Sequence, residues 1–392
     1  MNILITIYRS LGYGGAEVST NLLARELQKL GHKIVIASTQ KYLEIKTEIF
    51  KEFHKVPFYF FHEYYLSDFL RRLIRKYSID IVYPQDRLTT IPAIIAAKKE
   101  SKKVVVHFRD FWYACPMSSC LTPKLRNYDV CNYKIILNEF PKNRLLWNLY
   151  KWHYIKNSWK LLESADAKIV SSNIEKEKLL LCHIKTNINV IPIARDVGTF
   201  KNVNGEELKR KFSFKKYIVT FVGSLFYTKG VSILLKIIPI VLERNKNITF
   251  LIVGNGDMEV DVRRMINKNK IEDNVVLTGR LAIEDVAKAY AISDIVLLPS
   301  IWNEPFSAVP LEVGAVGKSL IASDIGAIKE MDGDFKILVK PFDYDGWIDS
   351  ILRLIRDRNL REALGENGKK MVKNYSIVKI SKKINSLFQS CT

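Results

Sequence analysis

The feature that most constrains this chain is an alternation, kept up along its length, between short apolar runs and longer segments with helical periodicity. Strands buried on both faces of a sheet have such continuous apolar runs, and a helix between two of them completes a βαβ unit. The runs in the first half are Asn2–Ile7, Lys33–Ala37, Ile79–Tyr83, Lys103–Val106, Ala167–Val170 and Asn189–Ile191. The sequence therefore predicts an α/β fold with parallel sheets.

The alternation starts again after a basic stretch around Lys201–Lys216. The second set of runs is Tyr217–Val222, Ile248–Val253, Asn274–Leu277, Asp294–Leu298 and Ser319–Ala322. A chain of 392 residues, 48% of them hydrophobic, is long enough to bury two cores. We predict two Rossmann-like domains at 1–195 and 216–373, a linker at 196–215, and a C-terminal helix at 374–392 that crosses back to the first domain. Ligands bind beyond the carboxyl ends of parallel strands, so we expect the domains to face each other across a cleft that holds the active site.

The chain is strongly basic, with 61 Lys and Arg against 41 Asp and Glu, a formal net charge of +20. This balance favours anionic partners such as nucleotides, nucleic acids or acidic lipid headgroups. We find no nucleic-acid-binding module, so no nucleic-acid partner is expected. The first residues are typical of a strand rather than a signal peptide, and no apolar run approaches the roughly 18 residues of a membrane span. We expect a cytoplasmic protein.

The five cysteines do not indicate a disulfide framework, because their number is odd and they are scattered. Cys115, Cys120 and Cys131 lie closest together, but their spacing matches no standard zinc pattern. We therefore expect reduced thiols, no metal site and no cofactor.

A Trp-rich basic segment, Arg144–Lys160, has its aromatic residues at roughly helical spacing. Such a helix can lie on a membrane surface, so we expect a peripheral contact with the inner face of a membrane. The alternative is that the aromatic side chains pack into their own domain.

Two carboxylates, Glu304 and Glu312, follow the apolar run at Asp294–Leu298. Pro305 suits the first position of a helix, because its missing N–H is not needed there. If the helix begins at Pro305, Glu304 lies at its N-terminus and Glu312 about 12 Å further along the axis. Carboxylates that far apart can bind the two ends of one extended polar ligand, with a phosphate at the helix N-terminus between them. A nucleotide diphosphate sugar has this shape.

Glycine-containing turns follow several of the predicted strands, and each has a structural alternative. Gly14 and Gly15 follow the first strand, where N–H groups can hold a phosphate, although a tight turn alone gives the same pattern. Gly223 and Ser224 follow the first strand of the second half. Lys229 in the same loop can neutralise a diphosphate or lie in solvent.

Charged side chains follow two other predicted strands. Arg280, after Gly279, can contact a phosphate or stack on a base. Arg109 and Asp110 follow the run at Lys103–Val106, where they can contact a substrate or simply pair with each other to hold the loop.

Together these residues resemble the retaining glycosyltransferases of the two-domain GT-B fold, of the family-4 or group-1 type, over nearly the whole chain. The resemblance rests on motifs in family order: Gly14-Gly15-Ala16-Glu17, Arg109-Asp110-Phe111-Trp112 with Cys115-Pro116, Val190-Ile191-Pro192, Val222-Gly223-Ser224-Leu225 with Lys229-Gly230, Gly254-Asn255-Gly256, Glu304-Pro305-Phe306 with Leu311-Glu312, and Ser323-Asp324-Ile325-Gly326 with Glu330.

The resemblance implies that a hexose passes from a UDP- or GDP-sugar to a hydroxyl of a glycan or lipid-linked acceptor, with retention and without a metal. It places the acceptor on the first domain and the nucleotide sugar on the second. It implies that Glu312 holds the ribose and Glu304 the donor sugar. The backbone amides of Phe306 and Ser307, with Lys229 and the Gly14–Gly15 turn, would contact the diphosphate. Glu304, Lys229, Arg109 and Asp110 are the predicted catalytic residues, and Gly223, Ser224 and Arg280 complete the predicted donor site.

Four features depart from the family pattern. Ser224 replaces the usual Arg, Arg109 the usual His, Ser307 a common Gly, and Ile193-Ala194 the usual Asn-Gly. The first two departures motivate an alternative, a catalytically inactive partner subunit that binds the nucleotide sugar. An epimerase or a phosphorylase of the same fold is a further alternative, although no signature of a pyridoxal-phosphate lysine is visible.

Overall fold

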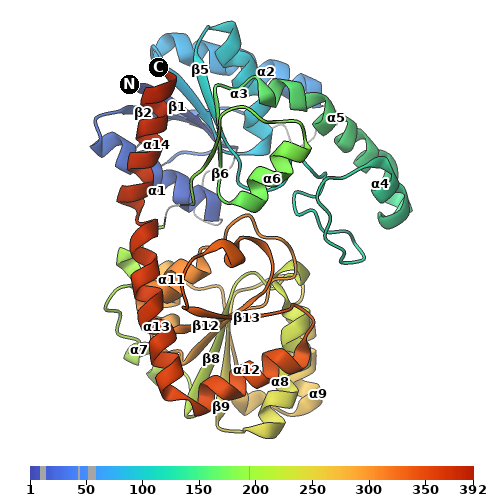
Figure 1. Ribbon diagram of the computed structural model, residues 1–392, viewed down its shortest axis with the longest axis vertical. Coiled ribbons are helices and arrows are strands. Elements are labelled where there is room, and N and C mark those ends of the chain that lie inside the picture. Colours follow the sequence, from blue (N-terminus) through green and yellow to red (C-terminus); the bar gives the residue numbers. More distant parts are fainter. Residues whose placement is uncertain (9–14, 43–44, 52–58, 194) are drawn as a thin grey trace. The chain divides into compact units, whose positions relative to one another are not determined.

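The structure is a computed structural model that describes residues 1–8, 15–42, 45–51, 59–193 and 195–392. It divides into two compact units, the first formed by Met1–Arg195 and Ile377–Thr392 and the second by Asp196–Ser376. Each unit is a parallel sheet covered by helices, which confirms the predicted α/β fold with two parallel sheets (Figure 1).

The sheet of the first unit has, within the described ranges, seven parallel strands in the order β3-β2-β1-β4-β5-β6-β7. The strands are β1 (Asn2–Thr6), β2 (Lys33–Ser38), β3 (Lys46–Ile49), β4 (Ile81–Pro84), β5 (Lys103–His107), β6 (Ala167–Val170) and β7 (Ile188–Val190). The helices are α1 (Gly15–Lys29), α2 (Tyr59–Lys76), α3 (Arg87–Lys99), α4 (Tyr133–Glu139), η1 (Lys142–Arg144), α5 (Leu145–Glu163) and α6 (Asn173–Leu181). Sequence order reverses between β1 and β4, which makes this the topological switch point of the sheet.

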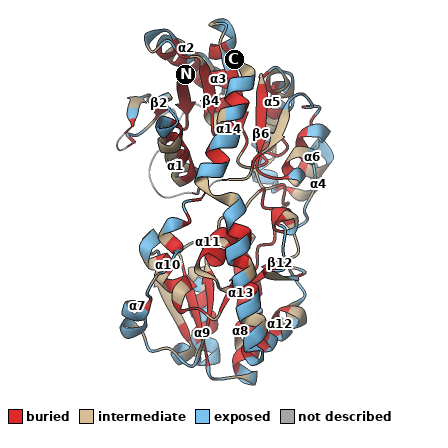
Figure 2. Ribbon diagram, turned by 60° about the vertical axis from the view of Figure 1, so that its left-hand side comes forward, coloured by how far each residue is buried: buried red, intermediate tan, exposed pale blue. Residues whose placement is uncertain are grey.

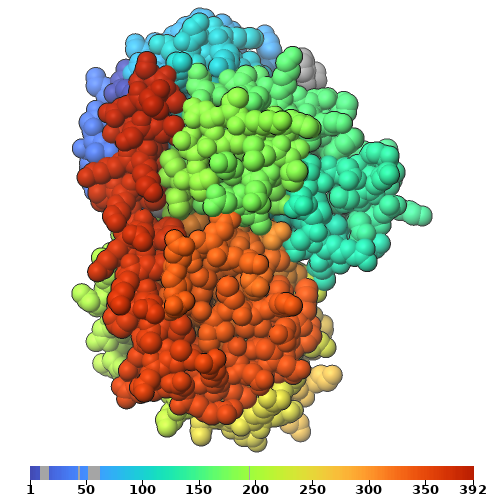
Figure 3. Space-filling view, in the orientation of Figure 1, coloured from blue at the N-terminus to red at the C-terminus, as the bar shows by residue number. Residues whose placement is uncertain are grey.

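The C-terminal helix α14 (Ile377–Cys391) packs against α1 of the first unit. One face of the helix, with Ile380, Ile384 and Phe388, is buried in the core of that unit. Phe388 also meets the Tyr83 ring edge-on, with the ring centroids 5.0 Å apart. Figure 3 shows the other face of the helix at the surface of the first unit.

The sheet of the second unit has six strands in the order β10-β9-β8-β11-β12-β13. They are β8 (Tyr217–Val222), β9 (Ile248–Val253), β10 (Val275–Gly279), β11 (Ile295–Leu298), β12 (Ser319–Ser323) and β13 (Lys336–Val339). The helices are η2 (Gly198–Phe200), α7 (Glu206–Lys211), η3 (Tyr227–Lys229), α8 (Val231–Arg244), α9 (Glu259–Asn269), η4 (Glu272–Asn274), α10 (Ile283–Ile292), α11 (Val309–Val316), η5 (Gly326–Glu330), α12 (Tyr344–Arg356), α13 (Arg358–Val372) and η6 (Lys373–Tyr375). The switch point lies between β8 and β11.

Burial follows the pattern expected of such layers, with central strands buried on both faces and helices exposed on their outer sides (Figure 2). Each predicted apolar run overlaps a strand. The strands that the sequence did not predict, β3 and β13, each lie at one edge of their sheet. Residues 196–215, expected to form a linker, carry η2 and α7, and Phe200 and Leu208 belong to the core of the second unit. Among the described helices, none is both long and apolar enough to cross a membrane.

Candidate functional site

Lys229 and Glu304 meet at the switch point of the second unit. Lys229 ends η3, which follows β8, and Glu304 lies in the loop after the neighbouring strand β11. The Lys229 Nζ is 2.6 Å from Glu304 Oε1. Because the carboxyl ends of parallel strands lie at one edge of a sheet, two residues 75 positions apart in sequence form one ion pair.

Glu304 is held as a buried carboxylate with only 6% of its surface exposed. The Ser300 hydroxyl also donates to Oε1, over 2.5 Å. Burial acts to raise the pKa of Glu304, but the Lys229 charge and hydrogen bonds from Lys229, Ser300 and Ser307 together lower it below its ordinary value. Glu304 is therefore ionised at neutral pH and keeps the Lys229 ammonium in place.

Close backbone contacts between loops fix this ion pair. A Cβ on Gly254 (φ +133°) would lie 1.9 Å from the carbonyl oxygen of Gly223. A Cβ on Gly326 (φ +70°) would lie 2.6 Å from the Glu304 nitrogen, and the Ala327 N–H donates to the Glu304 carbonyl over 2.9 Å. Only glycine fits such an approach, so these glycines allow the loops after β8, β9, β11 and β12 to pack together.

Glu312 lies in a different position from the one expected. The helix after β11 begins at Val309 rather than at Pro305, so Glu312 is in its first turn, with Pro310 before it. The prediction was wrong because Pro310, like Pro305, suits a helix start and the sequence does not decide between them. Glu312 is 5% exposed, and its Oε2 accepts a hydrogen bond of 3.1 Å from the Tyr290 hydroxyl of α10.

Phe306 and Ser307 lie between Glu304 and Glu312 in the sequence. Their N–H groups donate to no backbone carbonyl among the described residues. The Phe306 side chain packs against the core of the second unit. Its ring centroid lies 5.9 Å from that of Tyr375. The backbone of this segment is thus anchored by a partly buried ring, while its amides can bind a ligand.

The other predicted donor residues lie in the turns after β8 and β10. The Gly223 N–H donates to the Val253 carbonyl over 3.0 Å, and the Gly254 N–H to the Gly279 carbonyl over 2.8 Å. These bonds tie the two turns to the loop after β9. Ser224 and Arg280 are exposed at this edge.

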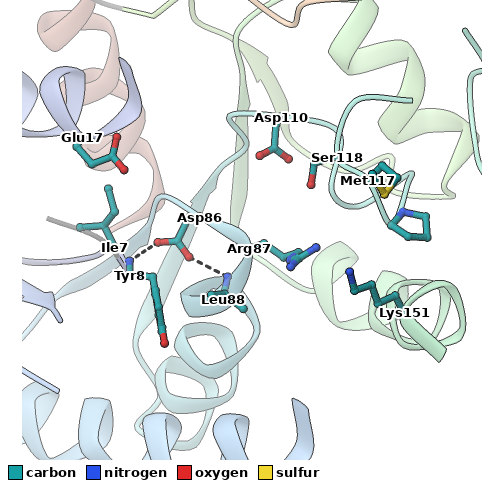
Figure 4. A pocket seen from close by; sticks show the side chains of 11 residues that line it. Ile7, Tyr8, Glu17, Asp86, Arg87, Leu88, Asp110, Met117, Ser118 and Lys151 are labelled. Atoms are coloured by element: carbon teal, nitrogen blue, oxygen red, sulfur yellow. Dashed lines mark hydrogen bonds between the residues drawn. The ribbon is translucent and has the colours of Figure 1, made fainter. Parts of the chain in front are cut away.

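The first unit has a pocket of about 610 Å³ at its own switch point, beyond the ends of β1 and β4 (Figure 4). It is lined by Ile7, Tyr8, Glu17, Asp86, Arg87, Leu88, Asp110, Pro116, Met117, Ser118 and Lys151. Three carboxylates and two cations thus gather around one concave site.

Two of the pocket carboxylates are held in different ways. Asp86 caps α3: its oxygens accept from the Leu88 N–H at 2.8 Å and the Thr89 N–H at 3.0 Å, and from the N–H of Tyr8. Burial nevertheless raises its pKa. Burial raises the pKa of Asp110 to about 6, against the lowering effects of the Trp112 N–H, the Arg87 charge and Ser118. Asp110 therefore titrates close to neutral pH.

Arg109 does not line this pocket, although Asp110 does. Its guanidinium donates to Ser19 of α1 over 2.9 Å and to Gln85 after β4 over 2.5 Å. His107, the nearest histidine in sequence, is 3% exposed and bonded through Nδ1 to the Tyr83 hydroxyl. Burial and the Arg109 charge lower the pKa of His107 well below its ordinary value. Gly14 and Ala194 lie outside the described residues, and Gly15 begins α1.

Several residues of these sites were missed in the sequence, among them Ser300, Tyr290, Asp86, Arg87 and Lys151. Asp86 had a detectable signal, since an Asp between an apolar run and a helical segment is a typical N-cap at a strand's carboxyl end. Tyr290 and Ser300 had none, because only their contacts with the two glutamates mark them. Within the described ranges no group of three or more His, Cys, Asp or Glu side chains is arranged to hold a metal ion.

Two family descriptions match adjoining parts of the chain. Residues 13–198 match Glycosyltransferase Family 4, and residues 204–371 match the glycosyl transferases group 1. The chain is similar to an alpha-D-kanosaminyltransferase from Streptomyces kanamyceticus, with 29% identity over 175 residues, 43% of this chain and 45% of the relative. The match thus spans about half the length of this curated relative.

Solved structures match over the full length. A structure of HepE from Anabaena in complex with UDP has a TM-score of 0.77 and 18% identity, covering 100% of both chains. A glycosyltransferase from Rickettsia africae has a TM-score of 0.78 and 21% identity, covering 100% of this chain and 98% of that one. These structures share the two-sheet GT-B fold with this chain. Fold, motif order and family matches agree, and the chain belongs to the family-4, group-1 glycosyltransferases.

Proposed function

We propose that this chain is a retaining glycosyltransferase that moves a hexose from a UDP- or GDP-sugar to a hydroxyl of a glycan or lipid-linked acceptor. The observation that carries the proposal is the Lys229–Glu304 ion pair at the switch point of the second unit. Nearby in sequence are the Phe306 and Ser307 amides, which donate to no backbone carbonyl in the described part of the chain, and the buried Glu312. A cation, N–H donors and carboxylates in this order match the phosphates and hydroxyls of a nucleotide sugar.

Each residue of the donor site has a proposed part. Lys229 and the N–H groups of Phe306 and Ser307 bind the diphosphate, while Glu304 keeps Lys229 in place and contacts sugar hydroxyls. Glu312, oriented by Tyr290, accepts hydrogen bonds from the ribose. Gly223, Ser224 and Arg280 complete the diphosphate end, and Gly14 and Gly15 belong to it by the family resemblance.

Departure of the nucleotide diphosphate is the step that these groups assist. Negative charge grows on the bridging phosphate oxygen as the glycosidic bond breaks, and fixed donors stabilise that charge more than they stabilise the ground state. The acceptor hydroxyl then bonds to the anomeric carbon on the face that the phosphate leaves. Its proton passes to the departing phosphate oxygen, so the step needs no pair of catalytic carboxylates.

The pocket of the first unit is the proposed acceptor site. Asp110 lines it and is partly protonated near neutral pH, so its carboxyl group can orient an acceptor hydroxyl. Arg109 ties α1 to the end of β4 and thereby supports the pocket wall as a positioning residue. A UDP-sugar is the first candidate for the donor, because the structurally similar HepE from Anabaena has been solved in complex with UDP-glucose.

Peripheral membrane contact remains part of the proposal. The segment of α4 and the start of α5 protrudes from the first unit (Figure 3) and exposes Tyr133, Leu137, Leu146 and Trp147, with Leu146 84% exposed. Trp152 and Trp159 instead donate their indole N–H groups to the carbonyls of Cys131 and Tyr113. Vesicle co-sedimentation tests this contact: Leu146→Ser with Trp147→Ser should weaken binding, and Leu181→Ser, an exposed leucine on α6, should not.

A thermal-shift screen with UDP, GDP, ADP and their sugars tests the donor site, because a ligand of the native state raises the melting temperature. We expect stabilisation by one nucleotide, lost in Glu312→Ala and Lys229→Ala. No shift with any nucleotide would contradict the proposal.

The alternative is a catalytically inactive subunit that binds a nucleotide sugar. It is favoured by Ser224, which supplies no charge, and by the Arg109 side chain, which is engaged in structural hydrogen bonds. Stabilisation by a nucleotide sugar without release of the nucleotide, with any acceptor or with water, would support this alternative.

A further inference from the structure

The second unit has a pocket of about 570 Å³ at the amino ends of its strands. Tyr217 begins β8, Asp294 precedes β11 and Ser319 begins β12, and all three line the pocket. Much of the remaining wall comes from the end of α12 and the start of α13. Lys229 and Glu304 lie beyond the opposite ends of β8 and β11, so the length of these strands separates the pocket from the proposed donor site. The volume is in the range of small-molecule sites.

Cations outnumber carboxylates in this pocket. The lining contains five cations, Lys216, Lys318, Arg356, Arg358 and Arg361, and two carboxylates, Asp294 and Glu362. Glu362 is paired with Arg358 over 2.7 Å. One oxygen of Asp294 accepts from the Ile218 N–H over 2.9 Å. The cations remain in excess even when Asp357 is counted, which caps α13 next to Arg358.

Most of these cations have no carboxylate in direct contact. Among the five, Arg358 alone forms an ion pair within 4.0 Å in the part of the chain that the structure describes. Lys318 is half-buried, and Asp294 is the carboxylate that acts on it. Burial lowers the pKa of Lys318, nearby cations add to the lowering, and Asp294 opposes it. The carboxylates of the pocket therefore neutralise only part of its charge.

Arg361 is held in a fixed orientation with part of its guanidinium group open. Its Nη1 donates to the carbonyl of Ile355 over 2.9 Å and to that of Leu354. Its Cζ lies 5.7 Å from the centroid of the Tyr217 ring. Among the described residues, Nε and Nη2 of Arg361 have no acceptor. These two nitrogens form an edge that can bind two oxygens of one phosphate side by side.

We infer that this pocket binds a soluble phosphate ester, with Arg361 and Lys318 in contact with the phosphate. A phosphate ester carries about two negative charges near neutral pH, which matches the excess of cations better than a single carboxylate does. The volume leaves room for the organic part of the ester. Among the described lining residues no large apolar side chain is exposed, so the pocket offers no apolar anchor for a lipid. The ligand is distinct from the nucleotide sugar, and the inference does not rest on the proposed function.

Lysine acylation of the full chain, mapped by mass spectrometry, tests the inference. The probes are inorganic phosphate, ribose 5-phosphate, sodium chloride at matched ionic strength, and phosphatidylcholine vesicles with and without phosphatidylglycerol. We expect both phosphate probes to slow acylation of Lys318 by about fivefold or more, because a bound anion covers its ammonium group. Lys370, an exposed lysine of α13 outside the pocket, is the internal control. Lys229, read in the same spectra, reports separately on binding at the donor site.

The sodium chloride arm separates a binding site from general screening of charge. Equal slowing by sodium chloride, equal slowing at Lys370, or no slowing at Lys318 by either phosphate probe would overturn the inference. Slowing at Lys318 by the phosphatidylglycerol vesicles alone would also overturn it, and would assign the pocket to a lipid headgroup.

Variants give a second measurement, made by isothermal titration with the more protective phosphate probe. Lys318→Met should weaken binding by about tenfold, because a charged contact is lost. Lys318→Arg should keep most of the affinity, and Lys370→Met should leave it unchanged. Removing the half-buried charge of Lys318 should not lower the melting temperature, which shows that the variant folds. Unchanged binding in Lys318→Met would contradict the assignment, and the acylation of the parent chain decides the question without any variant.

Discussion

The two units place their functional residues at the same topological position but complete it in opposite ways. In the second unit, Lys229 and Glu304 satisfy each other across the switch point, and glycine contacts lock the loops around them. In the first unit, the switch point opens into a pocket lined by three carboxylates and two cations. The proposed donor site contains an internal ion pair and close backbone contacts, whereas the proposed acceptor site is a concave pocket.

We attribute the difference to the ligands proposed for the two sites. A nucleotide diphosphate has the same charges and hydroxyls whatever sugar it carries, so a fixed set of paired groups suits it. The pocket proposed for the acceptor is lined by residues that follow β1, β4 and β5 and by residues of α1, α3 and α5. Loops supply much of this lining, and loops vary more readily than the sheet that carries them. Predictions that act on one unit but not on the other test this division.

The largest effect is expected from Lys229→Ala. Sugar transfer should fall by about a thousandfold, because a fixed positive charge at the leaving diphosphate is lost. The variant should also lose about 3 kcal/mol of unfolding free energy in urea denaturation, since Glu304 remains buried without its ammonium partner. Adding Glu304→Gln should restore part of the stability but not the transfer. Lys236 is an exposed lysine of α8, and Lys236→Ala is the control. Equal transfer by Lys229→Ala and Lys236→Ala would show that Lys229 does not act in transfer.

Asp110→Asn should lower transfer by about a hundredfold without changing nucleotide affinity, because the change lies in the other unit. Where the parent chain is active, kcat/KM should fall as the pH drops below about 6, since Asp110 becomes protonated there. The variant should lose that dependence. If kcat/KM falls at acid pH in the same way in the parent chain and in Asp110→Asn, the pH dependence comes from another group.

The same substitution has a consequence for stability with a defined sign. The pKa of Asp110 is raised in the folded protein, so its stabilising contribution is present at low pH and is lost as the pH rises from its ordinary value of 3.8 through about 6. Asp110→Asn should therefore match the parent chain in acid and exceed it in unfolding free energy above that range. Chemical denaturation at a series of pH values measures the difference.

Glu312→Gln should weaken nucleotide binding by about tenfold, because a neutral amide accepts weaker hydrogen bonds from the ribose hydroxyls than a carboxylate. Tyr290→Phe removes only the group that orients Glu312, so its effect should be smaller, about threefold. Isothermal titration with the stabilising nucleotide checks both variants. Equal nucleotide affinities in the parent chain and both variants would show that Glu312 does not bind the ribose.

Ser224→Arg should have the smallest effect and the opposite sign. Ser224 is exposed at the edge that carries Lys229, so an arginine fits there and adds a positive charge near the diphosphate. We expect about threefold tighter nucleotide binding. Unchanged affinity would show that Lys229 and the amides already neutralise the diphosphate fully.

Much of the fold was predictable because burial on both faces of a parallel strand leaves a direct trace in the sequence. Tyr217–Val222 and Ile248–Val253 were predicted with the bounds that the strands have. β3 and β13 were missed because each is only partly buried at a sheet edge and lacks a continuous buried run, whereas the edge strands β7 and β10 were predicted. The start of α11 was placed four residues early, because two prolines offered equally good first positions.

By itself, the sequence determined the α/β class, the two sheets and the candidate donor motif, because strand burial, glycine turns and residue order are local properties. Only the tertiary structure decided which side chains meet: Lys229 with Glu304, Tyr290 with Glu312, and Asp110 rather than Arg109 at the pocket of the first unit. The physical reason is that the order of strands in a sheet, which no local pattern encodes, determines which strand ends are neighbours. Burial at those ends then shifts the pKa values of the side chains that lie there.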